Sequence, residues 1–362
     1  MRLPKHIFLG TFLVLPFALC GELRTWTDSN GQTMEAGFIQ YLEKEEKVAI
    51  LRNGLEYQVP LGRFSQPDQE YILQEHAKFH KPPAARAEEL KGLQASASFR
   101  TRAFSTPEGY FGDPNVVRFV RAFKWSNRTH LESLGYDPLL EKMAIFVPPN
   151  YDHTIPFGVY VAISPGNKAW IPNKAYQEVL TRHRLISVSV HNSGNGQGIF
   201  RRTGLALDAL ATVHLLHKTD PARFYVGGVS GGGITATHAH FLYPKHFKAS
   251  FNIVRGALPD PFEVPIDVPG KYKKGQVFGN AWPYLSSEDW KRLALQRPDS
   301  RWIFLSGTKD YNYEFAKASA PQWRNKGFQS KFFDVPGLGH QNVPAEWFEK
   351  ALLWAEVKSE PK

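Results

Sequence analysis

Short apolar runs alternate with amphipathic stretches over the C-terminal two thirds of the chain. Each run is rich in Val, Ile and Phe and ends near Gly, Pro, Ser or Asn, which predicts a buried strand. Apolar residues recur at three- and four-residue intervals between the runs, which predicts helices. We expect strands at 143–147, 158–163, 185–190, 224–226, 249–254, 301–305 and 331–335, and helices at 175–182, 203–217, 234–241 and 344–357. The alternation indicates an α/β fold with a mostly parallel sheet flanked by helices.

A different pattern occupies residues 21–76, where short runs at 23–27, 35–40, 47–51 and 55–59 indicate strands, the last of them alternating with period two. Turn signals such as Asn53-Gly54 separate the runs, as in β-hairpins. The pattern predicts a small all-β domain that ends in a short helix with Ser65 as its N-cap. The length of 362 residues accommodates this domain and a second, larger one.

The two domains are expected to be joined by a Pro-, Ala- and Lys-rich linker over 77–100, with the larger domain at 101–362. An insertion at about 256–300 separates two of the predicted strands and is rich in Pro, Gly and aromatic residues. Such an insertion could form a lid or a wall of a substrate cleft. Its aromatic residues are Phe262, Tyr272, Phe278, Trp282, Tyr284 and Trp290.

Residues 1–20 read as a secretory signal peptide. Arg2 and Lys5 precede an apolar run at 7–19, which is too short for a comfortable membrane span. We therefore expect an exported protein, periplasmic or extracellular, with membrane anchoring through the N-terminus as the alternative. Cys20 is the only cysteine, so cleavage after it leaves a chain with no disulfide, thiol nucleophile or cysteine metal site.

The formal net charge is +10, although acidic residues outnumber basic ones over 21–76. A basic α/β domain is compatible with an anionic polymer as a partner, or with an ordinary basic surface. No recognised nucleic-acid-binding motif is present, so nucleic acid is not expected as a partner.

The segment Gly228-Val-Ser230-Gly-Gly232 follows a predicted strand and precedes a predicted helix. This is the G-x-S-x-G nucleophile elbow, in which a serine sits on a sharp turn with its hydroxyl exposed. Glycines two before and two after the serine leave room for the turn. We expect Ser230 to be a catalytic nucleophile.

A serine nucleophile needs a base and a group that orients the base. Asp310 follows the strand at 301–305, and His340 follows the strand at 331–335. The carboxyl ends of parallel strands share one edge of the sheet, so both residues are expected beside Ser230. Asp334 is the competing acid, but it lies within a predicted strand.

The oxyanion of acyl transfer needs two N–H donors. Gly231 directly follows the nucleophile and is expected to supply one. The other is expected from the loop after an early strand, where Pro165 cannot donate, so the choice lies between Gly166 and Asn167.

Three further residues are candidates for substrate binding: His191 and Asn192 in a Gly-rich loop, and Trp282 in the insertion. The histidine pairs of the chain lack a carboxylate at ligand spacing, so no metal site is predicted. Hydrolysis by serine, histidine and aspartate needs no cofactor, and none is expected.

The region from about 140 to 355 resembles the extracellular esterase branch of the α/β-hydrolases, close to polyhydroxybutyrate depolymerases and feruloyl-esterase-like proteins. The matching segments are 146–152, 220–233, 243–247, 307–310 and 337–340. The resemblance implies an α/β-hydrolase fold and a Ser-Asp-His triad. Ser164-Pro165 in the oxyanion loop is one departure, since many relatives carry His-Gly there and this chain has Pro165-Gly166, and the aromatic insertion is a second.

Residues 22–74 resemble the SLA-homology module, a small SH3-like barrel. The matching segments are 24–28, 30–31, 48–51, 53–54, 59–61, 64–65, 68 and 71–72. In that family the module serves interaction or spacing roles, which implies a contact with the cell surface or a polymer.

We therefore expect an exported serine hydrolase that cleaves carboxylic esters through an acyl-enzyme. Its expected substrates are acyl esters on polysaccharides, polyester oligomers and small acyl esters. A serine peptidase of the same fold is one alternative, because the triad alone does not separate esters from amides. A non-catalytic secreted binding protein on a hydrolase scaffold is the other, and the sequence leaves the oligomeric state open.

Overall fold

The computed structural model describes residues 23–42, 45–52, 55–79, 91–100, 104, 136–278, 285–296 and 298–357. The predicted signal peptide at 1–20 and the candidate Trp282 lie outside these residues. Among the residues described, no helix has the length and apolar character needed to cross a lipid bilayer.

The N-terminal region forms a four-stranded antiparallel sheet in the order β1-β2-β3-β4. The elements are β1 (Leu23–Thr27), β2 (Thr33–Leu42), β3 (Lys47–Arg52), β4 (Leu55–Pro60), the 3-10 turn η2 (Leu61–Arg63) and α1 (Gln66–Phe79). Trp26 lies at the centre of their core, against Phe64 and Ile72, and its indole N–H donates to the Ala36 carbonyl at 2.8 Å. The alternating pattern thus places its apolar positions on one buried side.

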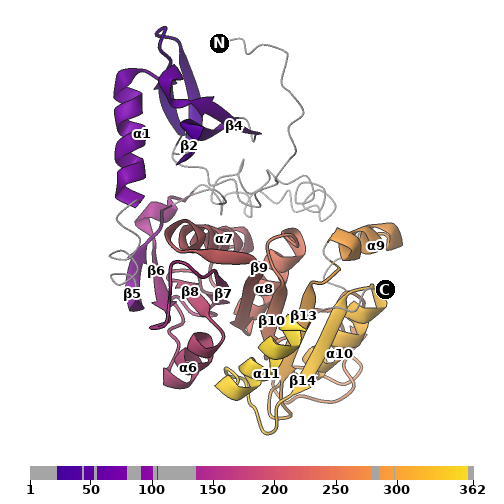
Figure 1. Cartoon of the computed structure of the whole chain (residues 1–362). Helices are drawn as coiled ribbons and strands as arrows, with labels where there is room; N and C mark the ends of the chain where they lie inside the picture. The colour runs from indigo at the N-terminus through magenta and orange to yellow at the C-terminus, as the bar shows by residue number, and fades with distance from the viewer. Residues whose placement is uncertain are drawn as a thin grey trace.

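The second region is built on an eight-stranded sheet in the order β14-β13-β10-β9-β7-β8-β6-β5 (Figure 1). The strands from β14 to β8 run parallel, whereas β6 is antiparallel to β8 and to β5. Their bounds are β5 (Gly92–Ser98), β6 (Lys142–Val147), β7 (Phe157–Ile163), β8 (Leu185–Val190), β9 (Thr219–Val229), β10 (Ala249–Ile253), β13 (Arg301–Ser306) and β14 (Gln329–Asp334). The sheet is therefore mixed, with its antiparallel pairs at one edge.

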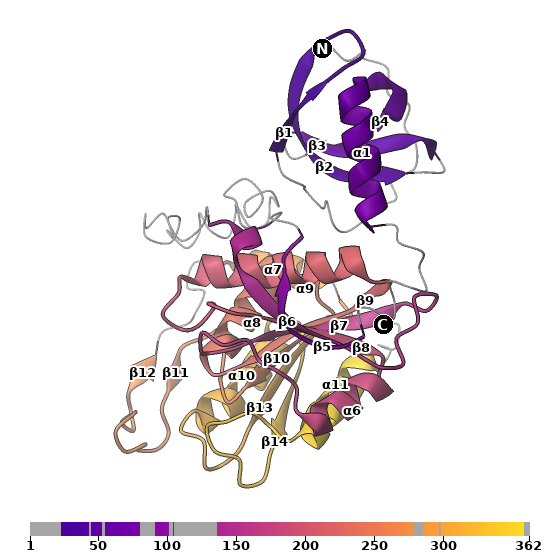
Figure 2. The same cartoon turned by 90° about the vertical axis from the view of Figure 1, so that its left-hand side faces the viewer.

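Helices cover both faces of this sheet (Figure 2). The helices are α6 (Lys174–Arg182), α7 (Ile199–Leu216), α8 (Gly231–Leu242), α9 (Ser287–Gln296), α10 (Tyr313–Asn325) and α11 (Ala345–Glu356). Buried side chains of α7, α8, α9 and α10 share one core, and those of α6 and α11 share the other. The result is a three-layer, α/β-hydrolase-like fold with a central strand, β9, that runs into a helix.

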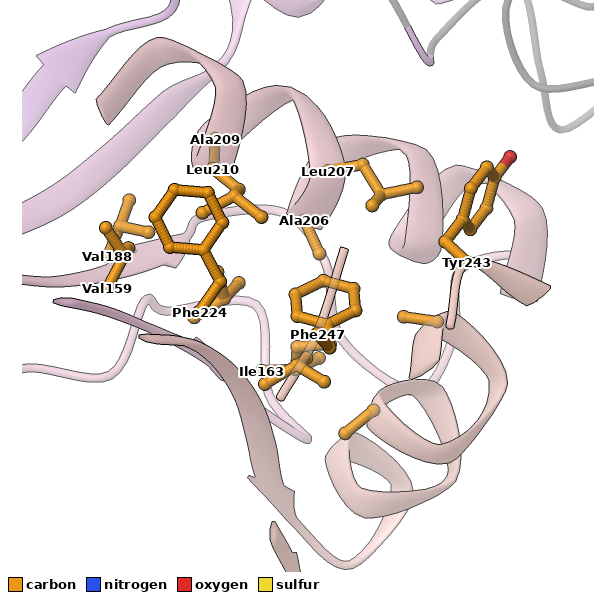
Figure 3. Close-up of a cluster of buried hydrophobic side chains, with 14 of the residues drawn as sticks. Val159, Ile163, Val188, Ala206, Leu207, Ala209, Leu210, Phe224, Tyr243 and Phe247 are labelled. Carbon is orange, nitrogen blue, oxygen red and sulfur yellow. The ribbon is translucent and has the colours of Figure 1, made fainter. Parts of the chain in front are cut away.

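Alternation along β7 shows how one strand serves both cores. Val159 and Ile163 face the α7 side, whereas Tyr160 and Ala162 face α6 and α11. Figure 3 shows Val159, Ile163 and Phe224 beneath α7. Such two-sided burial explains why the strands read as continuous apolar runs.

The structure corrects the predicted linker at both of its ends. Helix α1 extends to Phe79, and Gly92–Ser98 forms the edge strand β5 rather than part of a linker at 77–100. The residues of β5 are mostly small and only weakly alternating in hydrophobicity, so the sequence carried little strand signal.

Candidate active site

Ser230 occupies a strained turn between β9 and α8, with φ 54° and ψ −118°. A left-handed φ is uncommon for a residue with a side chain and marks a position that its surroundings must hold. The Ser230 N–H donates to the Ile253 carbonyl at 2.9 Å. A Cβ on Gly228 or Gly232 would clash with the Ile163 carbonyl oxygen at the end of β7, so both positions require glycine.

The structure brings the three predicted triad residues into one hydrogen-bonded chain. His340 Nε2 lies 2.8 Å from Ser230 Oγ, and His340 Nδ1 lies 2.8 Å from Asp310 Oδ1. Asp310 follows β13 and His340 follows β14, so both loops leave the carboxyl edge of the sheet. With Nδ1–H donated to the carboxylate, Nε2 can accept the Ser230 hydroxyl proton.

Asp310 is buried and has hydrogen-bond partners besides the histidine. Its carboxylate accepts from Ser306 Oγ at 2.5 Å and from the Asn312 N–H at 3.1 Å. These two donors hold the Asp310 carboxylate in the orientation in which it accepts from the His340 imidazole. The competing acid Asp334 instead accepts from the Tyr313 hydroxyl at 2.8 Å.

The insertion contacts the neighbours of both Asp310 and His340. Tyr311 stacks on the His340 imidazole, with 4.1 Å between ring centroids, and Lys271 Nζ lies 4.6 Å from the Tyr311 ring. The Tyr272 hydroxyl donates to Asn312 Oδ1 at 2.8 Å. The segment around residue 271 therefore forms part of the wall at the acid–base side of the site.

The insertion is held in turn by aromatic packing. The two short strands β11 (Phe262–Glu263) and β12 (Val277–Phe278) pair antiparallel. Their aromatic residues and Tyr272 pack against Phe315 of α10, with ring centroids 4.8 to 5.0 Å from it. Aromatic contacts of this kind contribute about 0.5–1.5 kcal/mol each beyond area burial.

A second strained residue, Val254, follows β10. Its φ of 48° is an outlier for a β-branched side chain. Its N–H donates to the Leu305 carbonyl at 2.7 Å, and its carbonyl accepts from Asn312 Nδ2 at 3.0 Å. Asn312 thus connects this strained turn to the insertion and to Asp310.

The predicted oxyanion residues have different surroundings. Gly231 is the first residue of α8, directly after the nucleophile. The Gly166 N–H donates to Ser164 Oγ at 3.1 Å, so its own loop already uses it. Asn167 Oδ1 accepts from the Gly194 N–H at 3.2 Å, which ties two loops together.

The candidates His191 and Asn192 make contacts within the protein. His191 Nδ1 accepts from the Ala169 N–H at 3.2 Å, and Nε2 lies 2.9 Å from the Ala95 carbonyl oxygen. Asn192 Nδ2 donates to Glu141 at 3.2 Å. The structure does not bring either side chain to Ser230, and the described residues contain no group of three metal-ligating side chains.

Sequence reasoning missed four residues that surround the triad: Asn195, Arg202, Tyr311 and Lys271. Tyr311 directly follows the predicted acid, and Asn195 lies in the Gly-rich loop that was expected to line the cleft, so a signal existed for both. No sequence signal pointed to Arg202 or Lys271, because an arginine in a predicted helix and a lysine in a loop usually lie on the protein surface.

No protein-family model and no curated protein sequence matches the chain. Among solved structures, Est1E from Butyrivibrio proteoclasticus is similar over 59% of this chain and 92% of its own, at 15% identity and a TM-score of 0.40. FphF, a fluorophosphonate-binding serine hydrolase of Staphylococcus aureus, is similar over 59% of this chain and 92% of its own, at 14% identity and a TM-score of 0.43. Acetyl xylan esterase from Aspergillus awamori is similar over 61% of this chain and 96% of its own, at 15% identity and a TM-score of 0.40.

Proposed function

We propose that this protein hydrolyses carboxylic esters through an acyl-enzyme on Ser230. The observation that carries the proposal is the hydrogen-bond chain Ser230–His340–Asp310, with 2.8 Å at each link. Nucleophile and base are within proton-transfer distance, and the base is oriented by a buried carboxylate.

The reaction follows from these positions. His340 Nε2 takes the Ser230 proton as Oγ bonds to the ester carbonyl carbon, and the C=O electrons move to the oxygen. The Gly231 N–H, at the start of α8, donates to that oxyanion. The tetrahedral intermediate collapses, His340 protonates the leaving alcohol, and a water activated by the same imidazole then releases the acid. Asp310 holds the imidazole tautomer and stabilises the imidazolium.

The substrate class is proposed from the sequence motifs that resemble extracellular esterases. Acyl esters on polysaccharides come first, followed by polyester oligomers and small acyl esters. A serine peptidase of the same fold remains the second candidate, because the triad serves amides by the same steps.

The place of action is also proposed from sequence. The basic start and apolar run of residues 1–20 support export, and the segments matching an SLA-homology module support an SH3-like interaction role for the N-terminal sheet. Such a module would hold the enzyme near a cell surface or polymer while the second region cleaves esters.

The test is turnover of p-nitrophenyl acetate by the exported chain and its variants. Ser230→Ala and His340→Ala are expected to lower kcat by at least about 10⁴-fold, because each removes a triad member. Ser29→Ala and His153→Ala change the same residue types in turns away from the triad and should leave kcat unchanged. Equal turnover by wild type and Ser230→Ala would show that the protein is not a serine esterase, and a protein without turnover would favour the binding-protein alternative.

A further inference from the structure

Acyl transfer at Ser230 requires a second donor for the oxyanion besides the Gly231 N–H. In the loop expected to supply it, neither Pro165 nor Gly166 has an N–H free for the oxyanion. Pro165 has no N–H, and the Gly166 N–H donates to Ser164 Oγ. The Asn167 nitrogen lies 3.0 Å from where a Cβ of Gly194 would stand, so another loop covers it.

That covering loop places a side-chain amide directly against Gly231. A Cβ on Gly231 would clash with Asn195 Oδ1 and lie 2.5 Å from Cγ and 2.8 Å from Nδ2. The Gly231 nitrogen and such a Cβ are bonded to the same Cα, so the Asn195 amide lies beside the residue whose N–H is proposed as the first oxyanion donor. The Asn195 side chain is exposed and makes no hydrogen bond among the described residues.

The backbone holds Asn195 in this position. Its N–H donates to the Pro165 carbonyl at 2.9 Å, and the preceding Gly194 N–H donates to Asn167 Oδ1 at 3.2 Å. Gly194 is buried against the backbone of Gly166, where a Cβ would come within 2.8 Å of the carbonyl carbon. The two loops therefore form one unit beside the nucleophile.

A single buried arginine fastens this unit to the elbow. Arg202 of α7 donates from Nε to the Ser193 carbonyl at 2.8 Å, from Nη1 to the Gly231 carbonyl at 3.1 Å, and from Nη2 to the Ser164 carbonyl at 3.1 Å. Burial lowers the pKa of Arg202 to about 10, so the side chain is still charged at neutral pH. Among the described residues no carboxylate forms an ion pair with Arg202, and its guanidinium donates to backbone carbonyl groups.

We propose that Asn195 Nδ2 is the second oxyanion donor and that Arg202 is the positioning residue that holds it beside Gly231. The inference rests on the proposed esterase function. When Ser230 Oγ bonds to the carbonyl carbon, the carbonyl oxygen becomes anionic and accepts from the Gly231 N–H and the Asn195 amide. No further reactant is needed.

The first experiment measures kcat and KM of Asn195→Ala and Asn195→Asp on p-nitrophenyl acetate. Loss of one oxyanion donor costs about 10²–10³-fold in kcat, so we expect a fall of about 100-fold in both variants with KM within about 3-fold of wild type. Asn150→Asp makes the same change at an exposed asparagine that donates to the Thr181 carbonyl, and it should leave kcat unchanged.

The second experiment tests whether Arg202 acts through Asn195. Arg202→Lys keeps the charge but cannot reach three carbonyls, and we expect it to lower kcat by at least about 10-fold. In the Asn195→Ala background the same change should lower kcat by a clearly smaller factor than in wild type, because the Asn195 amide that it positions is gone. A purely structural arginine would lower kcat equally in both backgrounds, and that result would overturn the positioning role.

The outcomes separate this inference from the proposed function. Wild-type kcat in both Asn195 variants, while Ser230→Ala is inactive, would overturn the Asn195 assignment and leave the esterase intact. Turnover that survives Ser230→Ala would overturn the esterase itself. If Arg202→Lys does not fold, the Asn195 variants alone decide, since their side chain is exposed.

Discussion

The two halves of the site are held by different kinds of contact. The nucleophile half, around Ser230 and Gly231, is fastened by hydrogen bonds from one buried guanidinium to three carbonyl groups. The acid–base half, around Asp310 and His340, is bounded by the insertion, through the contact of Lys271 with the Tyr311 ring and the hydrogen bond from Tyr272 to Asn312.

The difference shows that one half of the site is held by helices and loops of the central sheet, and the other half by an insertion between two of its strands. The contacts of the nucleophile half come from α7 and from the loops after β7 and β8, whereas the acid–base half depends on residues of an insertion between β10 and β13. We infer that changes in the first half alter kcat steeply, because backbone donors are displaced. Changes in the outer layers of the second half should have graded effects that shrink with distance from His340.

The largest effect is expected at Asp310. Asp310→Asn preserves size but disfavours the required imidazole tautomer, so kcat should fall by about 10⁴-fold with little change in Tm. Steady-state kinetics with a thermal melt measures both. Asp334→Asn is the matched control, since Asp334 bonds Tyr313 and not His340. A greater loss in Asp334→Asn would reverse the assignment of the acid.

Next in size is Asn312→Ala, which removes a buried amide between three segments. The Val254 carbonyl and the Tyr272 hydroxyl each lose a partner, so the free energy of unfolding should fall by about 1–3 kcal/mol. Because Asn312 also borders Asp310, kcat should fall by about 10-fold. Urea denaturation and kinetics provide the measurements, and unchanged values in both would separate the insertion from the acid–base half.

A smaller effect is expected when the ring on His340 is removed. Tyr311→Leu abolishes a contact of about 0.5–1.5 kcal/mol, so kcat should fall roughly 2- to 10-fold. Tyr313→Phe, two residues away, deletes only the hydroxyl that bonds Asp334 and should retain full activity. An equal loss of kcat in the two variants would mean that kcat depends on the start of α10 rather than on the ring stack with His340.

The smallest effect is expected for Lys271→Gln at the outer end of the stack. An exposed cation–π contact contributes about 0.5–1 kcal/mol, so kcat should change by no more than about 3-fold. Lys331→Gln removes a similar contact on Phe333 and should give wild-type kinetics. A loss larger than that of Tyr311→Leu would show that Lys271 binds substrate directly, and would break the proposed gradient.

Sequence alone anticipated the strands and the meeting of Ser230, Asp310 and His340, because strand ends in a parallel sheet share an edge. It did not anticipate β5, whose small residues alternate too weakly to stand out. Nor did it single out Arg202 or the hydrogen bond from the Gly166 N–H to Ser164, since both depend on tertiary geometry. Helices α9 and α10 were also not predicted, because α9 lies in the aromatic-rich insertion and α10 contains Pro321, which interrupts a helical pattern.

Active-site labelling tests whether Ser230 is an activated nucleophile. The protein is treated with a fluorophosphonate at neutral pH and examined by intact mass and peptide mapping. We expect one adduct per chain, on Ser230, which is absent in Ser230→Ala and forms much more slowly in His340→Ala. An unlabelled protein, or an adduct that persists in Ser230→Ala, would contradict this expectation.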